Sequence, residues 1–314
     1  MLGSLLVPLD GSTMAEQATI AAGEIARRHK ARLLLASVHP WGPDEDRPRP
    51  NTTADRELRQ TEMAYLEALR ARLSRAFGID VVAHLLDGSV APALADLARV
   101  EHVDLIVSST HGHGRLWHAL RSVGIIELVH RVTCPTLFIK PLQASPSVIP
   151  PQGFRRVLVA LDGSSDPAAM ARSVLELSAL GELLVSLVRV VSPQVWGNRS
   201  LVERQREALK YVCRVSRSLR RPGLQVRSRV LTSPDPPAAI LEEAGRSKSE
   251  LVVLAPRHRD RMGIVLLPSL TNAIVQRECP PVLVCHARTA PQRLPVLNPL
   301  HPLNDAFAAR GTTI

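Results

Sequence analysis

Residues 103–140 constrain the fold of this chain more than any other stretch does. They begin with a short apolar run, residues 103–107, of the kind that forms a strand buried on both faces. A Ser/Thr/His/Gly loop follows at 108–114, and apolar residues then recur at helical spacing up to Val132. A second apolar run comes at 136–139. Strand, loop, helix and strand in this order predict a βαβ unit with a right-handed parallel crossover.

The preceding residues alternate in the same way. Strand patterns lie at residues 4–9, 32–38 and 79–86, and helical patterns lie at 13–29, 54–77 and about 90–100. Strands that alternate with helices favour a parallel sheet covered on both faces. The sequence therefore predicts an open, Rossmann-like α/β fold.

The same order of strand and helix patterns then recurs later in the sequence. Residues 156–164 repeat residues 5–12, with the same strand followed by Asp-Gly-Ser. Residues 279–285 repeat residues 134–140. A duplication of this length indicates two domains, and 314 residues suit two domains of about 150 each. We expect domain 1 at 1–141, a linker at 142–154, domain 2 at 155–287 and a Pro-rich tail at 288–314.

Composition narrows the class of protein. The chain is 45% hydrophobic, which is typical of a packed globular protein, and no apolar run approaches the roughly 20 residues that span a bilayer. The first residues lack a basic start, so we expect no secretory signal. The four cysteines show no metal-ligand spacing. We therefore expect a cytoplasmic protein with reduced thiols, no metal site and no membrane partner.

The formal charge of +10 raises the question of nucleic acid. The arginines are spread over predicted helix faces, and no block of five or six like charges occurs. The densest runs, residues 214–221 and 257–261, lack the interleaved aromatic side chains that stack on bases. Solvated helix faces are the favoured interpretation, and nucleic-acid binding is the less favoured one.

The candidate site follows from the predicted topology. In an open parallel sheet, ligands bind beyond the carboxyl ends of the strands, where the strand order reverses. Asp10 ends the first strand and residues 108–114 end the fourth, so both are expected to face one crevice. Asp10 can accept hydrogen bonds from an amine such as an adenine edge. Gly112 and Gly114 let backbone amides approach a phosphate, and Arg115 adds charge-assisted contacts.

Structural roles explain part of the same pattern. Asp-Gly-Ser occurs three times, each time between a strand and a helix, where Ser12, Ser89 and Ser164 are natural cap residues. The chain has no GxxxxGK[ST] loop, and no GxGxxG follows the first strand. It also has no GxSxG elbow and no HExxH helix, so we expect no catalytic residues.

The sequence resembles the universal stress protein family, as two tandem domains over nearly residues 1–286. The matching features are the Asp-Gly-Ser after each first strand, Ser109–Gly112 after the fourth strand, and the Cys-Pro before the fifth. The resemblance implies, for each domain, an open five-stranded parallel sheet of the adenine nucleotide alpha hydrolase type. It also implies pairing through the last strand and a division into ATP-binding and non-binding members.

The binding members carry G-x-x-G, nine residues, then G-[ST]. In domain 1, Ser109 stands at the first glycine, Gly112 matches the second, and Ser122-Val123 stand where Gly-Ser belongs. The candidate nucleotide-binding residues of domain 1 are Pro8, Asp10, Val38, Ser109, Gly112, Gly114, Arg115, Ser122 and Val123. In domain 2, the glycine positions hold Ala255, His258 and Pro268. A β-carbon at such a position costs about 1 kcal/mol or more. ATP is therefore a candidate cofactor of domain 1 alone.

Three functions remain open. The leading interpretation is a non-catalytic stress-response binding or regulatory module with degraded nucleotide loops, whose domains pair within one chain. Its partners would be a second copy in a homodimer or another protein. An ATP-binding switch or slow ATPase acting through domain 1 is the alternative. A nucleic-acid-associated basic protein is the third.

Overall fold

The computed structural model describes residues 2–39, 52–109, 125–140, 150, 153–161, 174–176, 183–194, 200–219, 224–254, 267–275, 277 and 280–285. We call residues 2–140 the first half and residues 153–285 the second half. The glycine loop from residue 110 and the predicted tail lie outside the described residues.

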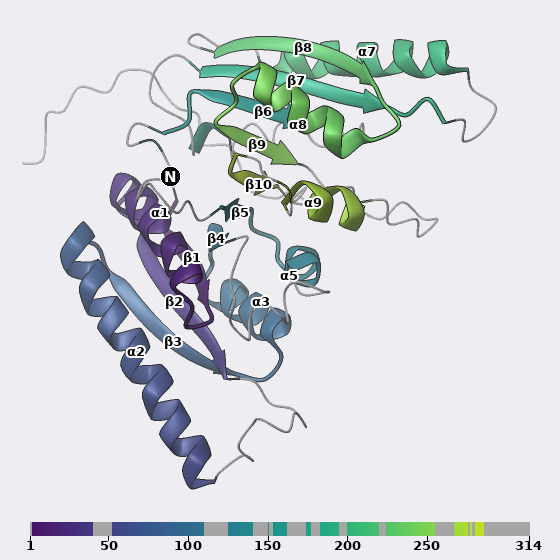
Figure 1. Cartoon of the computed structure of the whole chain (residues 1–314). Coiled ribbons are helices and arrows are strands. Elements are labelled where there is room, and N and C mark those ends of the chain that lie inside the picture. The colour runs from purple at the N-terminus through teal and green to yellow at the C-terminus, as the bar shows by residue number, and fades with distance from the viewer. Residues whose placement is uncertain are drawn as a thin grey trace, which may run out of the picture.

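Strands and helices alternate in both halves, and the segment between β6 and β7 that corresponds to α1 lies mostly outside the described residues (Figure 1). The first half contains β1 (Ser4–Leu9), α1 (Thr13–His29), β2 (Arg32–His39), α2 (Thr53–Phe77), β3 (Val81–Asp87), α3 (Val90–Val100), β4 (Leu105–Ser109), α5 (Ile125–Arg131) and β5 (Thr136–Ile139). The second half contains β6 (Arg156–Ala160), β7 (Leu183–Val191), α7 (Leu201–Ser218), β8 (Leu224–Thr232), α8 (Pro236–Arg246), β9 (Leu251–Leu254), α9 (Leu267–Val275) and β10 (Val282–Val284). The predicted strand–helix alternation is confirmed.

All ten strands belong to one sheet, in the order β3-β2-β1-β4-β5-β10-β9-β6-β7-β8. Neighbouring strands are parallel within each half, whereas β5 and β10 are antiparallel, with Leu137 opposite Leu283. The two predicted five-stranded parallel sheets are therefore present, and they pair through their last strands, as the resemblance implies, to form a single sheet. Because the junction is antiparallel, the strands of the two halves run in opposite directions. The carboxyl ends of the strands therefore lie on one side of the molecule in the first half and on the opposite side in the second.

Strand β4 differs from its predicted bounds. The apolar pattern predicts residues 103–107, whereas the strand covers Leu105–Ser109. Val103 still belongs to the turn after α3, because its N–H donates to the carbonyl of Ala98 and His102 adopts a left-handed φ of 50°. The far end is longer because Ser109 pairs with Ile139 of β5.

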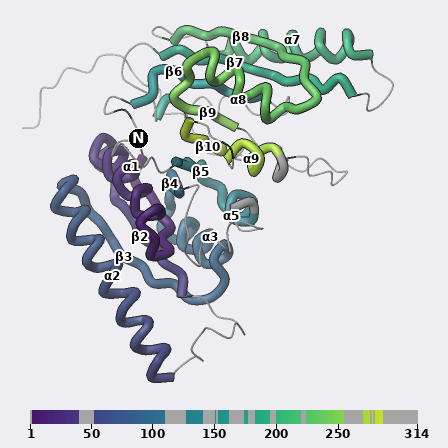
Figure 2. Tube along the Cα trace, viewed as in Figure 1, coloured from purple at the N-terminus to yellow at the C-terminus, as the bar shows by residue number. Residues whose placement is uncertain are grey.

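Helices cover both faces of the sheet, and the core crosses the junction on each face (Figure 2). On one face, side chains of α1, α2 and α7 pack into one continuous cluster that includes Phe154, which is fully buried. On the other face, Val129 and Phe138 of the first half pack with Ile240 and Ile274 of the second. A third cluster, around Leu94 beneath α3, lies within the first half. The halves are therefore packed together as one body.

Helix starts follow the sequence closely. Ser200 and Glu203 form a reciprocal capping box at the start of α7, and Thr52 caps α2 by accepting from the N–H of Asp55. None of the helices among the described residues has the length and apolarity that crossing a membrane requires.

His29, near the end of α1, makes a polar contact between the halves. Its Nε2 lies 2.9 Å from the carbonyl oxygen of Glu176, and its Nδ1 lies 3.5 Å from the N–H of Leu2. The neutral ring satisfies both partners, because Nδ1 accepts from Leu2 and Nε2–H donates to Glu176. Burial lowers the pKa of His29 from its ordinary value of 6.5, which favours the same neutral form.

We predict that acid weakens this contact. Because the folded pKa of His29 is depressed, its contribution to stability is complete above the unfolded pKa of about 6.5 and is lost as the pH falls from that value through the lower folded pKa. Urea unfolding of the wild type and of His29→Gln between about pH 8 and pH 5 measures the effect. The difference between their unfolding free energies should shrink toward acid pH. A difference that stays constant with pH would contradict the assignment.

We predict that truncating Phe138 loosens both halves. Phe138 is 1% exposed in the cluster that crosses the junction, so Phe138→Ala should cost about 4 kcal/mol. Hydrogen–deuterium exchange should rise in β4–β5 and also in β9–β10. Leu94→Ala is the matched control, because the Leu94 cluster belongs to the first half alone. Equal effects of the two variants on the second half would show that the shared core does not couple the halves.

Candidate functional site

The candidate site of the first half lies where the strand order reverses. Strand β1 lies between β2 and β4 and is parallel to both, so the chain winds outward in both directions from it. The pairing of Leu6 with Ile106, continued along both strands, sets Leu9 opposite Ser109. Asp10 and Ser109 therefore lie at adjacent strand ends on one edge of the sheet, as the sequence predicts.

Pro8 and Val38 support this edge from within the sheet. Pro8 is buried and pairs with Ala36 of β2, two residues before Val38. Val38 is 3% exposed and packs into the cluster beneath α3. The two residues are thus close in the sheet and fix the strand ends that flank Asp10.

Asp10 shapes the turn into α1. Its Oδ1 accepts the N–H of Ser12 at 2.9 Å, and the Ser12 hydroxyl accepts the N–H of Ala15 at 3.1 Å. The cap interpretation of Ser12 is confirmed. Gly11 has a φ of 77°, which favours glycine, although a β-carbon there would meet no atom within 4 Å. Because a carboxylate has about four acceptor positions, Asp10 keeps acceptor capacity for a ligand at this edge.

The other cap serines differ. Ser89 occupies the N-cap position of α3 without a side-chain cap hydrogen bond, and Ser164 lies outside the described residues.

Ser109 does not strain the backbone. It is the last residue of β4, is buried, and pairs with Ile139. It is not among the described non-glycine residues with positive φ, which are Lys30, His102 and Lys248. Serine at this glycine position therefore carries no positive-φ penalty, because its backbone is extended. Gly112, Gly114, Arg115, Ser122 and Val123 lie outside the described residues.

Tyr65 of α2 carries a buried hydroxyl that the sequence pattern did not reveal. Burial raises the pKa of its phenol, and the nearby carboxylates of Glu16 and Asp10 raise it further. The phenol is therefore held as a neutral O–H close to Asp10. Its place in the apolar stripe of α2 marked it only as a core residue.

A buried charge network lies at the same edge, beside the candidate crevice. His39, at the end of β2, has Nδ1 2.7 Å from a Glu62 oxygen and Nε2 3.0 Å from a carboxylate oxygen of Asp55. The other Asp55 oxygen receives Arg59 Nε at 3.2 Å, and Arg59 also reaches Asp87 at 2.6 Å. We call these five residues the His39 network.

The His39 network ties the first turns of α2 to the ends of β2 and β3. The side chains of His39 and Asp55 are 5% and 6% exposed, so these charges are held away from water. Both ring nitrogens of His39 lie within hydrogen-bond distance of a carboxylate oxygen. Burial makes the network costly to break, because a removed partner leaves a buried charge uncompensated.

The equivalent position in the second half holds no such network. Asp162 lies 152 positions after Asp10, and the same offset from His39 leads to Val191, which is 7% exposed in β7. Ala255 and His258, at two of the expected loop positions, lie outside the described residues. Pro268, at a third, is the second residue of α9, where a helix tolerates proline. Within the ranges described, no three His, Cys, Asp or Glu residues form a group that could hold a metal ion.

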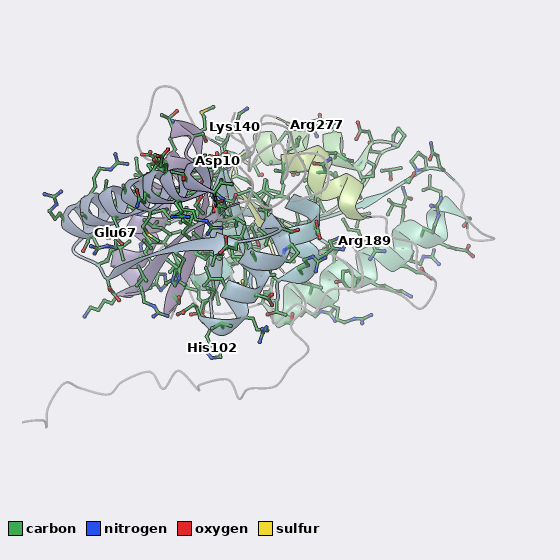
Figure 3. All side chains as sticks on the ribbon, turned by 90° about the horizontal axis from the view of Figure 1, so that it is seen from below. Asp10, Glu67, His102, Lys140, Arg189 and Arg277 are labelled. Carbon is green, nitrogen blue, oxygen red and sulfur yellow. The ribbon has the colours of Figure 1, made fainter. Side chains whose placement is uncertain are left out.

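Figure 3 labels charged residues of both halves. Asp10 and Glu67 are on the first half, whereas Arg189 and Arg277 are on the second. Arg189 of β7 lies over the ring of Tyr211 in α7, 5.3 Å from its centroid.

A doubly wound parallel sheet, with polar residues at the ends of its first and fourth strands, defines an α/β protein of the kind that binds ligands at a topological switch point. The model of the universal stress protein family matches residues 1–140 and again residues 153–286. The chain belongs to the universal stress protein family, with two copies of its domain in tandem.

Known proteins agree with this assignment. The chain is 31% identical over 151 residues to a Thermus aquaticus protein named "Universal stress protein in QAH/OAS sulfhydrylase 3'region". The aligned region covers 45% of this chain and 100% of that protein. A universal stress protein from Archaeoglobus fulgidus has a similar fold, with a TM-score of 0.62, 15% identity, and coverage of 90% and 96% of the two chains. The structure of a putative universal stress protein from Pseudomonas aeruginosa has a TM-score of 0.54 and a sequence identity of 14%. The match covers 91% of this chain and 93% of that one.

We predict that Asp55 stabilises the first half by far more than an exposed carboxylate does. Asp55→Ala leaves His39 and Arg59 without their shared partner and should lower the free energy of unfolding by about 3 kcal/mol. Glu67→Ala on the same helix removes an exposed partner of Arg70 and should cost no more than about 0.5 kcal/mol. Urea unfolding measures both. Equal losses would mean that the His39 network contributes no more than a surface ion pair.

Proposed function

We propose that the chain is a non-catalytic stress-response module that acts by binding, with the first half as its ligand-responsive part. The observation that carries this is the role of Asp10. Its carboxylate accepts from Ser12 N–H and so helps to hold the turn into α1, while it lies at the strand edge where a ligand would bind. A group that holds the turn and contacts a ligand suits recognition rather than chemistry.

Two further observations support binding over catalysis. The phenol of Tyr65 is held neutral, so it would act as a hydrogen-bond donor rather than as a base. The His39 network uses its carboxylates and imidazole on one another, with contacts of 2.6 to 3.2 Å throughout. Its charges are therefore committed to holding α2.

The ATP-binding switch or slow ATPase acting through domain 1 is the second candidate. It is favoured by the adjacent ends of β1 and β4 and by Ser109, whose extended backbone accepts a serine without strain. Gly112, Gly114 and Arg115 would then contact the phosphates. For domain 2 we propose no nucleotide, since Ala255, His258 and Pro268 replace the glycines.

Calorimetric titration of the full chain with ATP and Mg²⁺ distinguishes the two candidates. The binding module predicts dissociation constants weaker than about 0.1 mM and no release of phosphate above the buffer rate. Micromolar binding that Gly112→Val abolishes, and that His258→Gly leaves unchanged, would contradict it and establish the ATP switch in domain 1. Native mass spectrometry of the purified chain checks independently for retained nucleotide.

A further inference from the structure

The outer face of helix α7 carries more positive than negative charge, because four cations lie there beside two acids, Glu203 and Glu207. The four cations are Arg206, Lys210, Arg214 and Arg217. All four side chains are exposed, and among the described residues none has a hydrogen-bond or ion-pair partner. We call them the α7 cation stripe.

The four cations lie on one line of the helix. With 3.6 residues per turn, Lys210, Arg214 and Arg217 lie about 40°, 80° and 20° around the axis from Arg206. The buried residues of α7, Ala208, Val212 and Val215, lie on the opposite side and pack onto the sheet. The α7 cation stripe therefore points straight away from the core and extends about 16 Å along the helix.

Two apolar side chains border the stripe on one side. Val202 is 64% exposed and Leu209 is 52% exposed. They are seven residues apart, so they lie above one another on the same helix face. We call them the apolar rim. A cationic line beside an apolar line makes the outer face of α7 amphipathic in its own right.

The corresponding helix of the first half is different. Helix α2 connects β2 to β3 as α7 connects β7 to β8, yet Arg59, Arg70 and Arg72 of α2 are all ion-paired. Residues 1–140 contain 16 Lys and Arg against 16 Asp and Glu, whereas residues 153–286 contain 20 against 12. The excess positive charge thus belongs to the second half, and four of its described cations without a printed partner share the outer face of α7.

We propose that the outer face of α7 is a docking surface for an acidic amphipathic helix of a partner protein. A helix with carboxylates spaced four, four and three residues apart presents them at the same rise as the α7 cation stripe. Apolar residues beside those carboxylates would cover Val202 and Leu209. Charge complementarity sets the orientation and accelerates association, while the apolar rim supplies burial.

The apolar rim makes nucleic acid and lipid poorer partners for this face than an acidic helix. A phosphate backbone pairs with cations but leaves Val202 and Leu209 against charged oxygens, and the described face of α7 offers no exposed aromatic side chain for stacking on bases. A lipid surface rewards a wide apolar face rich in Trp, Phe and Leu, whereas α7 exposes two aliphatic side chains.

The test uses a fluorescein-labelled helical peptide of about five turns, with Glu at the spacing of the α7 cation stripe and Leu on the adjoining line. Its binding to the full chain is followed by anisotropy at low and at physiological salt. Two control peptides have the same length, one with Gln in place of Glu and one with the same residues in scrambled order. We expect the ordered acidic peptide to bind at least about tenfold more tightly than either control.

Substitutions in the full chain locate the site. R206Q/K210Q/R214Q/R217Q should weaken peptide binding about 30-fold, since four exposed ion pairs are lost. The matched control R56Q/R70Q/R72Q/R75Q removes four arginines from α2 and should leave binding within about twofold. V202S/L209S should weaken binding without changing its salt dependence. Circular dichroism melting confirms that each variant is folded.

Three results would overturn the proposal. The first is equal binding of the ordered and scrambled acidic peptides, which would reduce the effect to net charge. The second is an equal loss from the α2 and α7 variants. The third is binding of a short DNA duplex, or of vesicles containing phosphatidylserine, more tightly than the peptide and through the same four cations, which would assign the surface to nucleic acid or to lipid.

Discussion

The antiparallel pairing of β5 with β10 is the interaction on which the rest of the structure depends. It covers the edge that each five-stranded half would otherwise expose, and an exposed edge strand invites pairing with other chains. It also brings the buried side chains of both halves into shared clusters on both faces of the sheet. Since the halves run in opposite directions, it also sets the carboxyl ends of their strands at opposite ends of the sheet.

The two halves use the same helix position for different purposes. In the first half, α2 turns its charges inward, where His39, Asp55 and Arg59 hold the helix to the strand ends. In the second half, Val191 replaces the histidine, and the cations of α7 point outward. The same helix position thus supports an inward charge network in one half and an exposed charged surface in the other. This is possible because only the apolar face of the helix packs on the sheet.

Apolar runs bounded by turn residues predict most of the fold. Strand β1 and helix α1 occupy the predicted residues, and Ser12 acts as the predicted cap. The edges of β4 could not be predicted, because they depend on pairing with β5 and on the left-handed turn at His102. The joining of the two sheets depends on contacts between residues that are far apart in the chain, which hydrophobic periodicity does not encode.

The candidate site was predictable only in part. Asp10 and Ser109 follow apolar strands, so topology alone sets them at one edge. His39 gives no such signal, because its partners Asp55 and Glu62 come from a helix that begins only at Thr53. The useful clue would have been two acids seven residues apart on the inner side of α2. Tyr65 was missed because an aromatic residue in an apolar stripe is usually a core residue.

The fusion of both halves in one chain also fixes their ratio. Separate subunits that pair through their last strands can exchange, so two diverging copies would give mixtures of like and unlike pairs. Here the strand that would accept another subunit is already occupied within the molecule. Every molecule therefore carries one polar crevice of the first kind and one cationic helix of the second, and unequal synthesis cannot separate them.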